Sequence, residues 1–305
     1  MKFYNFLTNA EQTQRLSGDR QEQPLYENMQ FPCAAGVDLY CADASLWHWH
    51  DEMEVGFVRS GSLTVCVNDA QFLLREGEGI FVNTGVLHAY MDNKCTNAVF
   101  PNIVFLPVLV YGSRESVFWT DYVRPLTQAV RLSHLIFTKE IFWQAEVLKG
   151  IERTVQLFAQ GVSGSEFAVR AQLSDMVCRI CQHSQEQLWG SGHKDIEIER
   201  LRRMLAFVDA QYSKPVQLQQ IADSAFVSCR ECQRLFQKVI GTSPRQYVIQ
   251  LRLQKARQML TESSASICDI CDRCGFQDQS YFTKVFRERF GMPPAKFRRQ
   301  YMYEG

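Results

Sequence analysis

The chain has 305 residues and no net charge, with 33 Lys and Arg against 33 Asp and Glu. Hydrophobic residues make up 46% of the chain and charged residues 22%, which is the composition of an ordinary soluble globular protein. This length is enough for two or three domains with a sizeable core. No apolar run approaches the roughly twenty residues that a membrane-spanning helix needs, so we expect no membrane contact.

The charges are unevenly divided along the chain. From Lys194 onward there are 19 Lys and Arg against 12 Asp and Glu, a net charge of +7 (19 − 12). Before that point the counts are 14 against 21, a net charge of −7 (14 − 21). A basic C-terminal part beside an acidic N-terminal part favours nucleic-acid binding at the C-terminal end, with chance asymmetry as the alternative.

The N-terminus and the cysteines both indicate the cytoplasm. The sequence after Leu7 is too polar for a signal peptide. The chain holds 11 Cys, and unpaired thiols favour a reducing compartment. Several of them lie three residues apart, a spacing that zinc and redox sites also use. Helix periodicity places Cys232, Cys271 and Cys274 where a small apolar residue is needed, so we interpret these three as core residues.

The first third of the chain has the pattern of a β-structure. Residues 1–30 are polar and indicate an arm or a first strand. From Ala34 to Phe105, short alternating segments are separated by turn residues, and this even spacing predicts a β-sandwich or barrel within residues 1–120. The expected strands are Gly36–Tyr40, Glu54–Arg59, Ser62–Val67, Gln71–Leu74, Gly79–Val82, Leu87–Met91 and Val99–Phe105.

Residues of the types that bind metals occur within this region. His48-Trp49-His50 is followed by Glu54 and Gly61, and a second group runs from Gly77 to His88. Alternate strand residues point to one face, so His48 and His50 share a side of the sheet. Imidazoles and a carboxylate suit a divalent transition metal, and in the polar mouth of a barrel they can equally hydrogen-bond a sugar or an acid.

These residues resemble the two motifs of the cupin barrel. The pattern departs at Asn83, where cupins usually have Pro, and at Asp92, where they often have Asn. We expect the site to bind either a small effector or a divalent transition metal, and we expect no cofactor to be required. The resemblance implies that the four metal-ligand positions of metallocupins are occupied by His48, His50, Glu54 and His88.

Beyond residue 121 the apolar period becomes helical. One stripe extends from Ile141 to Phe158 and a second from Val169 to Ile180, with a Gly/Ser turn between them. They predict an antiparallel helix pair within residues 121–188 that either forms a dimer interface or only covers the barrel. The Gly/Ser-containing stretch at residues 189–195 coincides with the change of charge, so we expect it to be the linker.

Residues 196–305 contain one pattern twice. The copies run from Leu218 to Pro244 and from Ile267 to Pro294, and each has a short helix, a turn and a second helix. Ser228 and Asp278 end the two turns, where their side-chain oxygens can cap the next helix. A helix, a short turn and a helix form the motif whose second helix enters the DNA major groove.

The two copies resemble the paired motifs of the AraC/XylS family of bacterial transcription regulators. The resemblance rests on residues such as Ile221-Ala222, Arg234-Leu235-Phe236, Gly241-Thr242-Ser243-Pro244, Gly275-Phe276, Phe286-Arg287 and Phe290-Gly291. The resemblance implies a homodimeric regulator, more commonly an activator, that binds double-stranded DNA, responds to a small effector such as a sugar, and contacts RNA polymerase. The alternative is a metal-binding cupin, either a metalloenzyme or a metal sensor, fused to a DNA-binding module; we expect no enzymatic activity.

We expect exposed residues of each second helix to touch DNA. Arg230 and Gln233 share a surface from which Arg can read guanine and Gln adenine. For Arg234 the resemblance implies a place near DNA, and an internal salt bridge is the alternative. Lys284 and Arg287 suit phosphates, which position a protein without reading sequence. The whole expected set is Cys229, Arg230, Gln233, Arg234, Gln279, Ser280, Thr283, Lys284 and Arg287.

The sequence therefore predicts an α+β protein of two domains. The first is a cupin-like β-barrel or sandwich with an attached antiparallel helix pair, and the second is an all-α domain with two helix-turn-helix motifs.

Overall fold

The computed structural model describes residues 6–7, 30–40, 45, 47–92, 97–129, 131–189 and 196–301. The chain divides into two compact units, between Asp195 and Ile196. The first unit contains all the described strands, and the second is helical. Most of the expected N-terminal arm or strand lies outside the described residues, and so does the expected linker apart from its first residue, Trp189, whose backbone ends a short helix.

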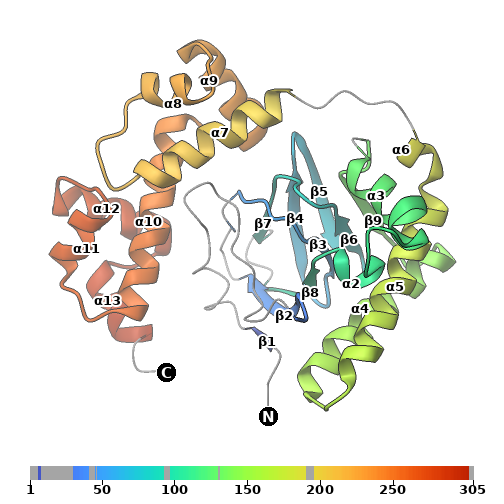
Figure 1. Cartoon of the computed structure of the whole chain (residues 1–305). Helices are drawn as coiled ribbons and strands as arrows, with labels where there is room; N and C mark the ends of the chain where they lie inside the picture. Colours follow the sequence, from blue (N-terminus) through green and yellow to red (C-terminus); the bar gives the residue numbers. More distant parts are fainter. Residues whose placement is uncertain are drawn as a thin grey trace. The chain divides into compact units, whose positions relative to one another are not determined.

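The strands of the first unit form two sheets (Figure 1). The larger has the strand order β1-β2-β8-β3-β6-β9 and the smaller β5-β4-β7. All neighbours are antiparallel except β1 and β2, which are parallel. The strands are β1 (Phe6–Leu7), β2 (Cys33–Tyr40), β3 (Met53–Phe57), β4 (Ser62–Val67), β5 (Ala70–Arg75), β6 (Gly79–Val82), β7 (His88–Asp92), β8 (Ala98–Phe105) and β9 (His134–Phe137).

The two sheets share one apolar core. Leu63 and Val65 of β4 and Leu74 of β5 pack with Ile80 of β6 and Phe100 of β8, all at most 1% exposed. Each strand alternates, so its other face points away from this core. The predicted β-sandwich or barrel is confirmed, and each of the seven expected strands is present.

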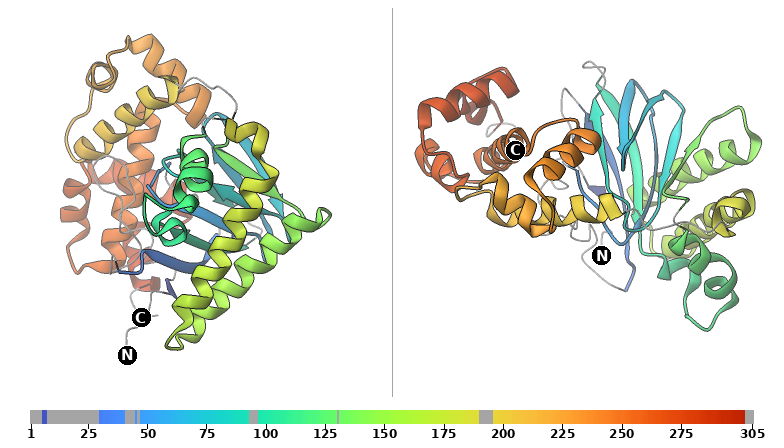
Figure 2. Two further views of the ribbon diagram at one scale, coloured as in Figure 1. Left: turned by 45° about the vertical axis from the view of Figure 1, so that its right-hand side comes forward. Right: turned by 90° about the horizontal axis from the view of Figure 1, so that it is seen from above.

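The outer face of the larger sheet is covered by helices (Figure 2). Met53 and Val55 of β3 belong to a second core together with Val147 of α4 and Leu173 of α5. The antiparallel helix pair was predicted correctly. The helices are α2 (Val108–Tyr111), the π-helix η1 (Phe118–Val123), α3 (Arg124–Gln128), α4 (Phe142–Gln160), α5 (Ser165–His183) and α6 (Gln185–Trp189).

One strand was missed. β9 lies inside the region that was predicted as helical, and it pairs with β6 at the edge of the larger sheet, with Gly79 opposite Phe137 and Val82 opposite His134. Four residues are too few for a period-two pattern to be distinguished from a helical one. Pairing over more than fifty residues of chain supplies the structure that the local sequence does not specify.

The second unit holds both predicted helix-turn-helix motifs. α8 (Leu218–Ser224) and α9 (Cys229–Leu235) form the first, and α11 (Ile267–Arg273) and α12 (Gln279–Phe290) form the second. Figure 1 shows α10 (Pro244–Glu262) running between them. The remaining helices of this unit are α7 (Ile196–Gln211), the π-helix η2 (Phe236–Ile240) and α13 (Pro294–Tyr301).

The turns and caps of the two motifs form as the sequence predicts. Ser228 Oγ accepts the Glu231 N–H at 3.2 Å, and an Asp278 carboxylate oxygen accepts the Tyr281 N–H at 2.6 Å. Each second helix therefore begins with a side-chain cap, which stabilises its first turn by about 1 kcal/mol.

The three cysteines of the second unit that were predicted to be core residues are buried. Cys232, Cys271 and Cys274 are each at most 2% exposed. The cysteines of the described ranges are free thiols. Within those ranges, no helix combines the length and the apolar character needed to cross a membrane.

Candidate functional sites

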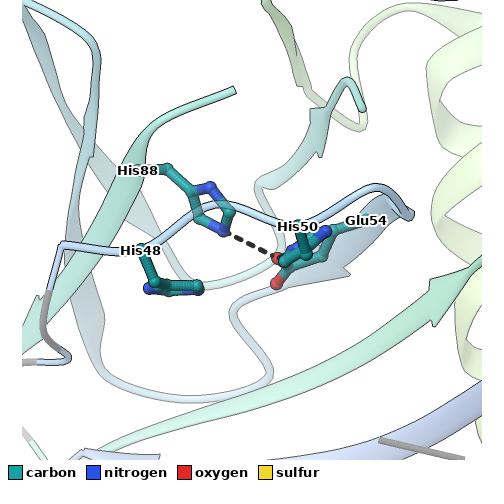
Figure 3. Close-up of side chains that lie close together, drawn as sticks. All are labelled: His48, His50, Glu54 and His88. Carbon is teal, nitrogen blue, oxygen red and sulfur yellow. Dashed lines mark hydrogen bonds and ion pairs between the residues drawn. The ribbon is translucent and has the colours of Figure 1, made fainter. Parts of the chain in front are cut away.

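A buried cluster of His48, His50, Glu54 and His88 lies between the two sheets (Figure 3), and we refer to it as the His/Glu cluster. His88 begins β7 of the smaller sheet, Glu54 lies in β3 of the larger one, and both other histidines precede β3. Backbone hydrogen bonds of 3.0 and 2.9 Å join His48 to His88 in an isolated antiparallel bridge. One ligand atom from each of the four residues lies within 4.8 Å of the others, so residues that are distant in sequence meet here.

Glu54 is the centre of the cluster. Its Oε2 lies 3.3 Å from His50 Nε2 and 3.1 Å from His88 Nε2. Its Oε1 accepts a hydrogen bond of 2.9 Å from the Tyr90 hydroxyl. All four cluster residues are at most 9% exposed, so water screens these contacts weakly.

The outer nitrogens of two histidines face backbone carbonyls. His50 Nδ1 lies 3.0 Å from the Glu52 carbonyl oxygen, and His88 Nδ1 lies 2.8 Å from that of Val86. A carbonyl oxygen only accepts, so each Nδ1 carries a hydrogen and donates it. In a neutral imidazole the other nitrogen, Nε2, then presents a lone pair, and both lone pairs point at the Glu54 carboxylate.

These two lone pairs and the negatively charged carboxylate repel one another unless a positive charge lies between them. Either protons on both imidazoles or a cation supplies that charge. Burial would raise the pKa of Glu54, but hydrogen bonds and positive charge from His50 and His88 outweigh it and hold this pKa far below its usual range. Burial, followed by the charge of Glu54, raises the pKa of Tyr90 well above its usual value, so the hydroxyl remains a donor.

The donor set fits a divalent transition metal. Imidazole nitrogens and a carboxylate oxygen are ligands for Zn, Fe, Ni or Cu ions. An outer N–H bonded to a carbonyl is the usual arrangement of a ligating histidine, since it fixes the tautomer and the ring orientation. His50, His88 and Glu54, with His48 beside them, would hold such an ion. The sequence indicated these four residues, but it gave no indication of the Tyr90 hydroxyl beyond its period-two relation to His88.

Asn83, one of the two departures from the cupin pattern, connects the end of β6 to the helical cover. Its Nδ2 donates to the Leu126 carbonyl at 2.8 Å and to the Leu132 carbonyl at 2.9 Å. On the other side of the same loop, the Thr84 hydroxyl donates to the Asp51 carbonyl at 2.6 Å. A Pro at position 83 has no side-chain donor, so it could not make the first two bonds.

The first recognition helix, α9, presents two predicted base-reading residues to solvent. Arg230 and Gln233 are both exposed, while Cys229 is half-buried and its thiol lies 3.1 Å from Gln219 Oε1. No ion pair or hydrogen bond of the Arg230 side chain is found among the described residues. Its guanidinium is therefore available to an external acceptor.

Arg234 has an internal partner set. Its guanidinium donates to Glu231 at 2.7 and 2.8 Å and to Glu197 of α7 at 2.5 Å. Lys238 shares the second carboxylate, at 2.9 Å. The salt-bridge alternative for Arg234 is thus what the structure contains, and DNA contact by this residue stays a prediction.

The second recognition helix, α12, brings its predicted residues together around one hollow. Gln279, Ser280 and Lys284 are exposed, and Lys284 lies 4.0 Å from Glu288. An acidic or polar group that enters a hollow needs hydrogen-bond donors around it, and the side chains that line this hollow include such donors. The hollow is lined by Gln279, Ser280, Thr283, Lys284, Arg287 and Pro293.

Both parts of the chain match known families. The family model of a helix-turn-helix domain matches residues 221–300, and that of a cupin domain matches residues 42–100. The uncharacterized HTH-type transcriptional regulator YdeC of Bacillus subtilis is 25% identical over 252 residues, which cover 83% of this chain and 85% of the relative. The HTH-type transcriptional activator RhaS of Escherichia coli is 26% identical over 254 residues, which cover 82% and 86% of the two chains. A solved structure of ToxT from Vibrio cholerae is 12% identical, with a TM-score of 0.46 over 88% of this chain and 98% of that one.

A C-terminal pair of helix-turn-helix motifs and an N-terminal cupin domain define the class as DNA-binding transcriptional regulators with a cupin-like ligand-binding domain. The helix-turn-helix domain is of the AraC type, and the relatives that match most of the chain are HTH-type transcriptional regulators.

Proposed function

We propose that this regulator senses a small molecule at the His/Glu cluster, through a divalent transition metal ion, and adjusts its DNA binding accordingly. The observation that carries the proposal is the convergence of His50 Nε2 and His88 Nε2 on one carboxylate oxygen, with a backbone carbonyl at each outer nitrogen. A bound ion would supply a Lewis-acid site for hydroxyl or carboxylate oxygens of an effector. A sugar has such hydroxyls and remains the proposed effector class.

Metal analysis of the purified full chain tests the metal part of this proposal. We expect about one equivalent of a transition metal after loading and chelator dialysis, because one set of buried donors converges here. His88→Ala and Glu54→Gln should each lose the metal, since each removes a ligand at the centre. His183→Ala is the matched control, because that side chain stacks on Trp143 outside the cluster. A wild-type chain that takes up no metal contradicts the proposal and leaves direct hydrogen bonding of an effector.

On the DNA side, we propose that α9 and α12 enter successive major-groove segments. Exposure of Arg230, Gln233, Gln279, Ser280 and Lys284 supports this assignment. The proposed parts are the effector domain at residues 1–120, the helical region at 121–188, the linker at 189–195 and the DNA-binding domain at 196–305. The proposal includes a homodimer in the cytoplasm that contacts RNA polymerase. It also includes activation of transcription, because the relative RhaS is named a transcriptional activator.

An effector must bind two states of the regulator with different affinity to control it. We therefore expect metal and effector together to change the affinity of the full chain for its DNA site. A screen of sugars and sugar acids, with DNA affinity as the readout, identifies the effector class. Equal DNA affinity with and without every metal-loaded candidate would remove the sensory part of the proposal.

A further inference from the structure

A groove in the second unit separates the two helix-turn-helix motifs, and we call it the inter-motif groove. It is lined by residues of both motifs and of the helix α10 that joins them. Gln233 of α9 stands on one side, and Asp278 and Tyr281 at the start of α12 stand on the other. The N-terminal part of α10 contributes Arg245 and Ile249 between them. The groove therefore runs from one recognition helix to the other.

If the two recognition helices read DNA, the position of the inter-motif groove determines which part of the duplex lies opposite it. The inference therefore rests on the proposed function. Recognition helices meet base edges with their N-terminal residues, in the major groove. Two successive major-groove segments on one face of a duplex are separated by the minor groove, which phosphates flank on both sides. The inter-motif groove then faces that minor groove.

The charged side chains of the inter-motif groove differ in their hydrogen-bond partners within the protein. The Arg252 guanidinium donates to the carbonyls of Tyr212 and Lys214 at 2.7 and 2.8 Å and lies over the Phe276 ring. Asp278 caps α12 through Tyr281 N–H. Arg245 is exposed, and neither an ion pair nor a hydrogen bond of its side chain is found among the described residues.

Arg245 thus differs from Arg234 of α9 and Lys238 of η2, which face carboxylates. Arg234 forms ion pairs with Glu197 and Glu231, and Lys238 forms one with Glu197. These carboxylates partly cancel the attraction of both side chains for phosphate. Arg245 keeps a full positive charge in the middle of the surface between the two helices. A guanidinium is also weakly hydrated, which lowers the cost of moving it from water into a narrow groove.

We propose that Arg245 is a third point of DNA recognition, at the minor groove between the two major-groove segments. A narrow minor groove in A·T-rich DNA has a strongly negative potential that attracts arginine. Through Arg245 the protein then prefers A·T pairs at positions that neither recognition helix touches.

The experiment uses the full chain and the duplex that it enriches from a randomised library. Arg245→Ala should lower affinity for that duplex and reduce the slope of log K against log salt by about one. Replacing the central A·T pairs by G·C should lower wild-type affinity about fivefold or more and have little effect on Arg245→Ala. Arg245→Lys should keep most of the salt slope but lose part of the A·T preference, because lysine is more strongly hydrated.

Arg273→Ala is the matched control, because Arg273 is an exposed arginine at the end of α11 that lines neither hollow. Thermal melting should be the same for both alanine variants, since the described residues offer the Arg245 side chain no ion pair or hydrogen bond that its removal would break. An equal affinity loss on both central sequences with the lower slope places the guanidinium on the flanking phosphates and overturns the minor-groove contact with its A·T preference. Unchanged affinity and slope for Arg245→Ala overturn the inference, whereas a wild-type chain that enriches no duplex overturns the proposed function instead.

Discussion

At the scale of single residues, Asn83 shows how one departure from a family pattern acquires a structural role. Its amide satisfies the carbonyls of Leu126 and Leu132, which belong to the helical cover and the approach to β9. The side chain is 3% exposed, so loss of its donors leaves two carbonyls without this partner in an apolar setting.

Asn83→Ala should therefore lower the free energy of unfolding by about 1–3 kcal/mol, because the Leu132 carbonyl loses its donor while the Leu126 carbonyl still accepts the Ala129 N–H at 3.2 Å. Asn83→Asp keeps the shape, removes the donors and places a buried carboxylate against two carbonyl oxygens, so it should lose more than Asn83→Ala. Urea unfolding followed by fluorescence measures the loss. Gln160→Ala, at the exposed end of α4, is the control, and equal unfolding midpoints for this control and Asn83→Ala would contradict the account.

Arg230 and Arg234 are one turn apart on α9 and should behave differently. Within the part of the chain that the structure describes, the Arg230 side chain has no ion pair or hydrogen bond, whereas Arg234 donates to two carboxylates. Arg230→Ala should relax sequence preference at one base pair, by about 1–3 kcal/mol of discrimination. Arg234→Ala should keep the ranking of operator mutants. Binding selections at one salt concentration compare the two, and an unchanged preference in Arg230→Ala would leave Gln233 as the main reader.

At the scale of elements, the turns of the two motifs have the same backbone and different residues. Phe226 has φ +55° and Gly275 has φ +79°, and the next residue in each turn donates its N–H to the carbonyl five residues earlier. This left-handed residue ends the first helix of each motif. A Cβ at Gly275 would lie 2.6 Å from the Tyr212 carbonyl oxygen, whereas Phe226 is 86% exposed.

Adding a side chain at the left-handed residue of one turn and removing it from the other should thus have opposite effects. Gly275→Ala combines a left-handed backbone with a clash against the main chain, and it should lower stability by roughly 2 kcal/mol or more. Phe226→Gly relieves the left-handed strain without losing buried area, and it should leave stability equal or raise it by up to about 1 kcal/mol. Thermal melting of the two variants decides this; a large loss in Phe226→Gly would show that the ring packs on the unit.

Elements with a strong local signal were predictable, and those held by distant partners were not. Ser228 and Asp278 predicted where the recognition helices begin, because an N-cap is a local interaction. The strands β2 to β8 followed from alternation between turns. β9 required its pairing with β6, and the bonds of Asn83 required the approach of residues 126 and 132, more than forty positions away. The four cluster residues were indicated by the resemblance to the cupin motifs, whereas Tyr90 as a donor and the ion pairs of Arg234 depend on packing.

The helix pair carries unusually exposed aromatic side chains. Phe142 at the start of α4 is 79% exposed and Phe167 near the start of α5 is 85% exposed. Covering such surface is favourable, so a fragment ending at Gln187 should form a dimer. Sedimentation at high concentration measures its mass, and a monomer under these conditions would count against the helix pair as the interface.

At the scale of the whole molecule, the division into two units separates two tasks. The acidic part holds the His/Glu cluster, and the basic part holds both helix-turn-helix motifs. A fragment from Lys194 to the C-terminus should therefore bind duplex DNA by itself, with affinity that falls as salt rises. A folded fragment without salt-dependent DNA affinity would refute the separation of tasks.

The central claim is that this chain reads DNA with two recognition helices. The most direct measurement is a binding selection from randomised duplexes with the full chain, followed by sequencing. The account predicts one enriched site with two preferred segments whose centres lie about one helical turn, roughly 10 base pairs, apart. Arg230→Ala should weaken the preference in one segment only. Recovery of no preferred sequence, or of a single short segment that is insensitive to changes in α12, would contradict the claim.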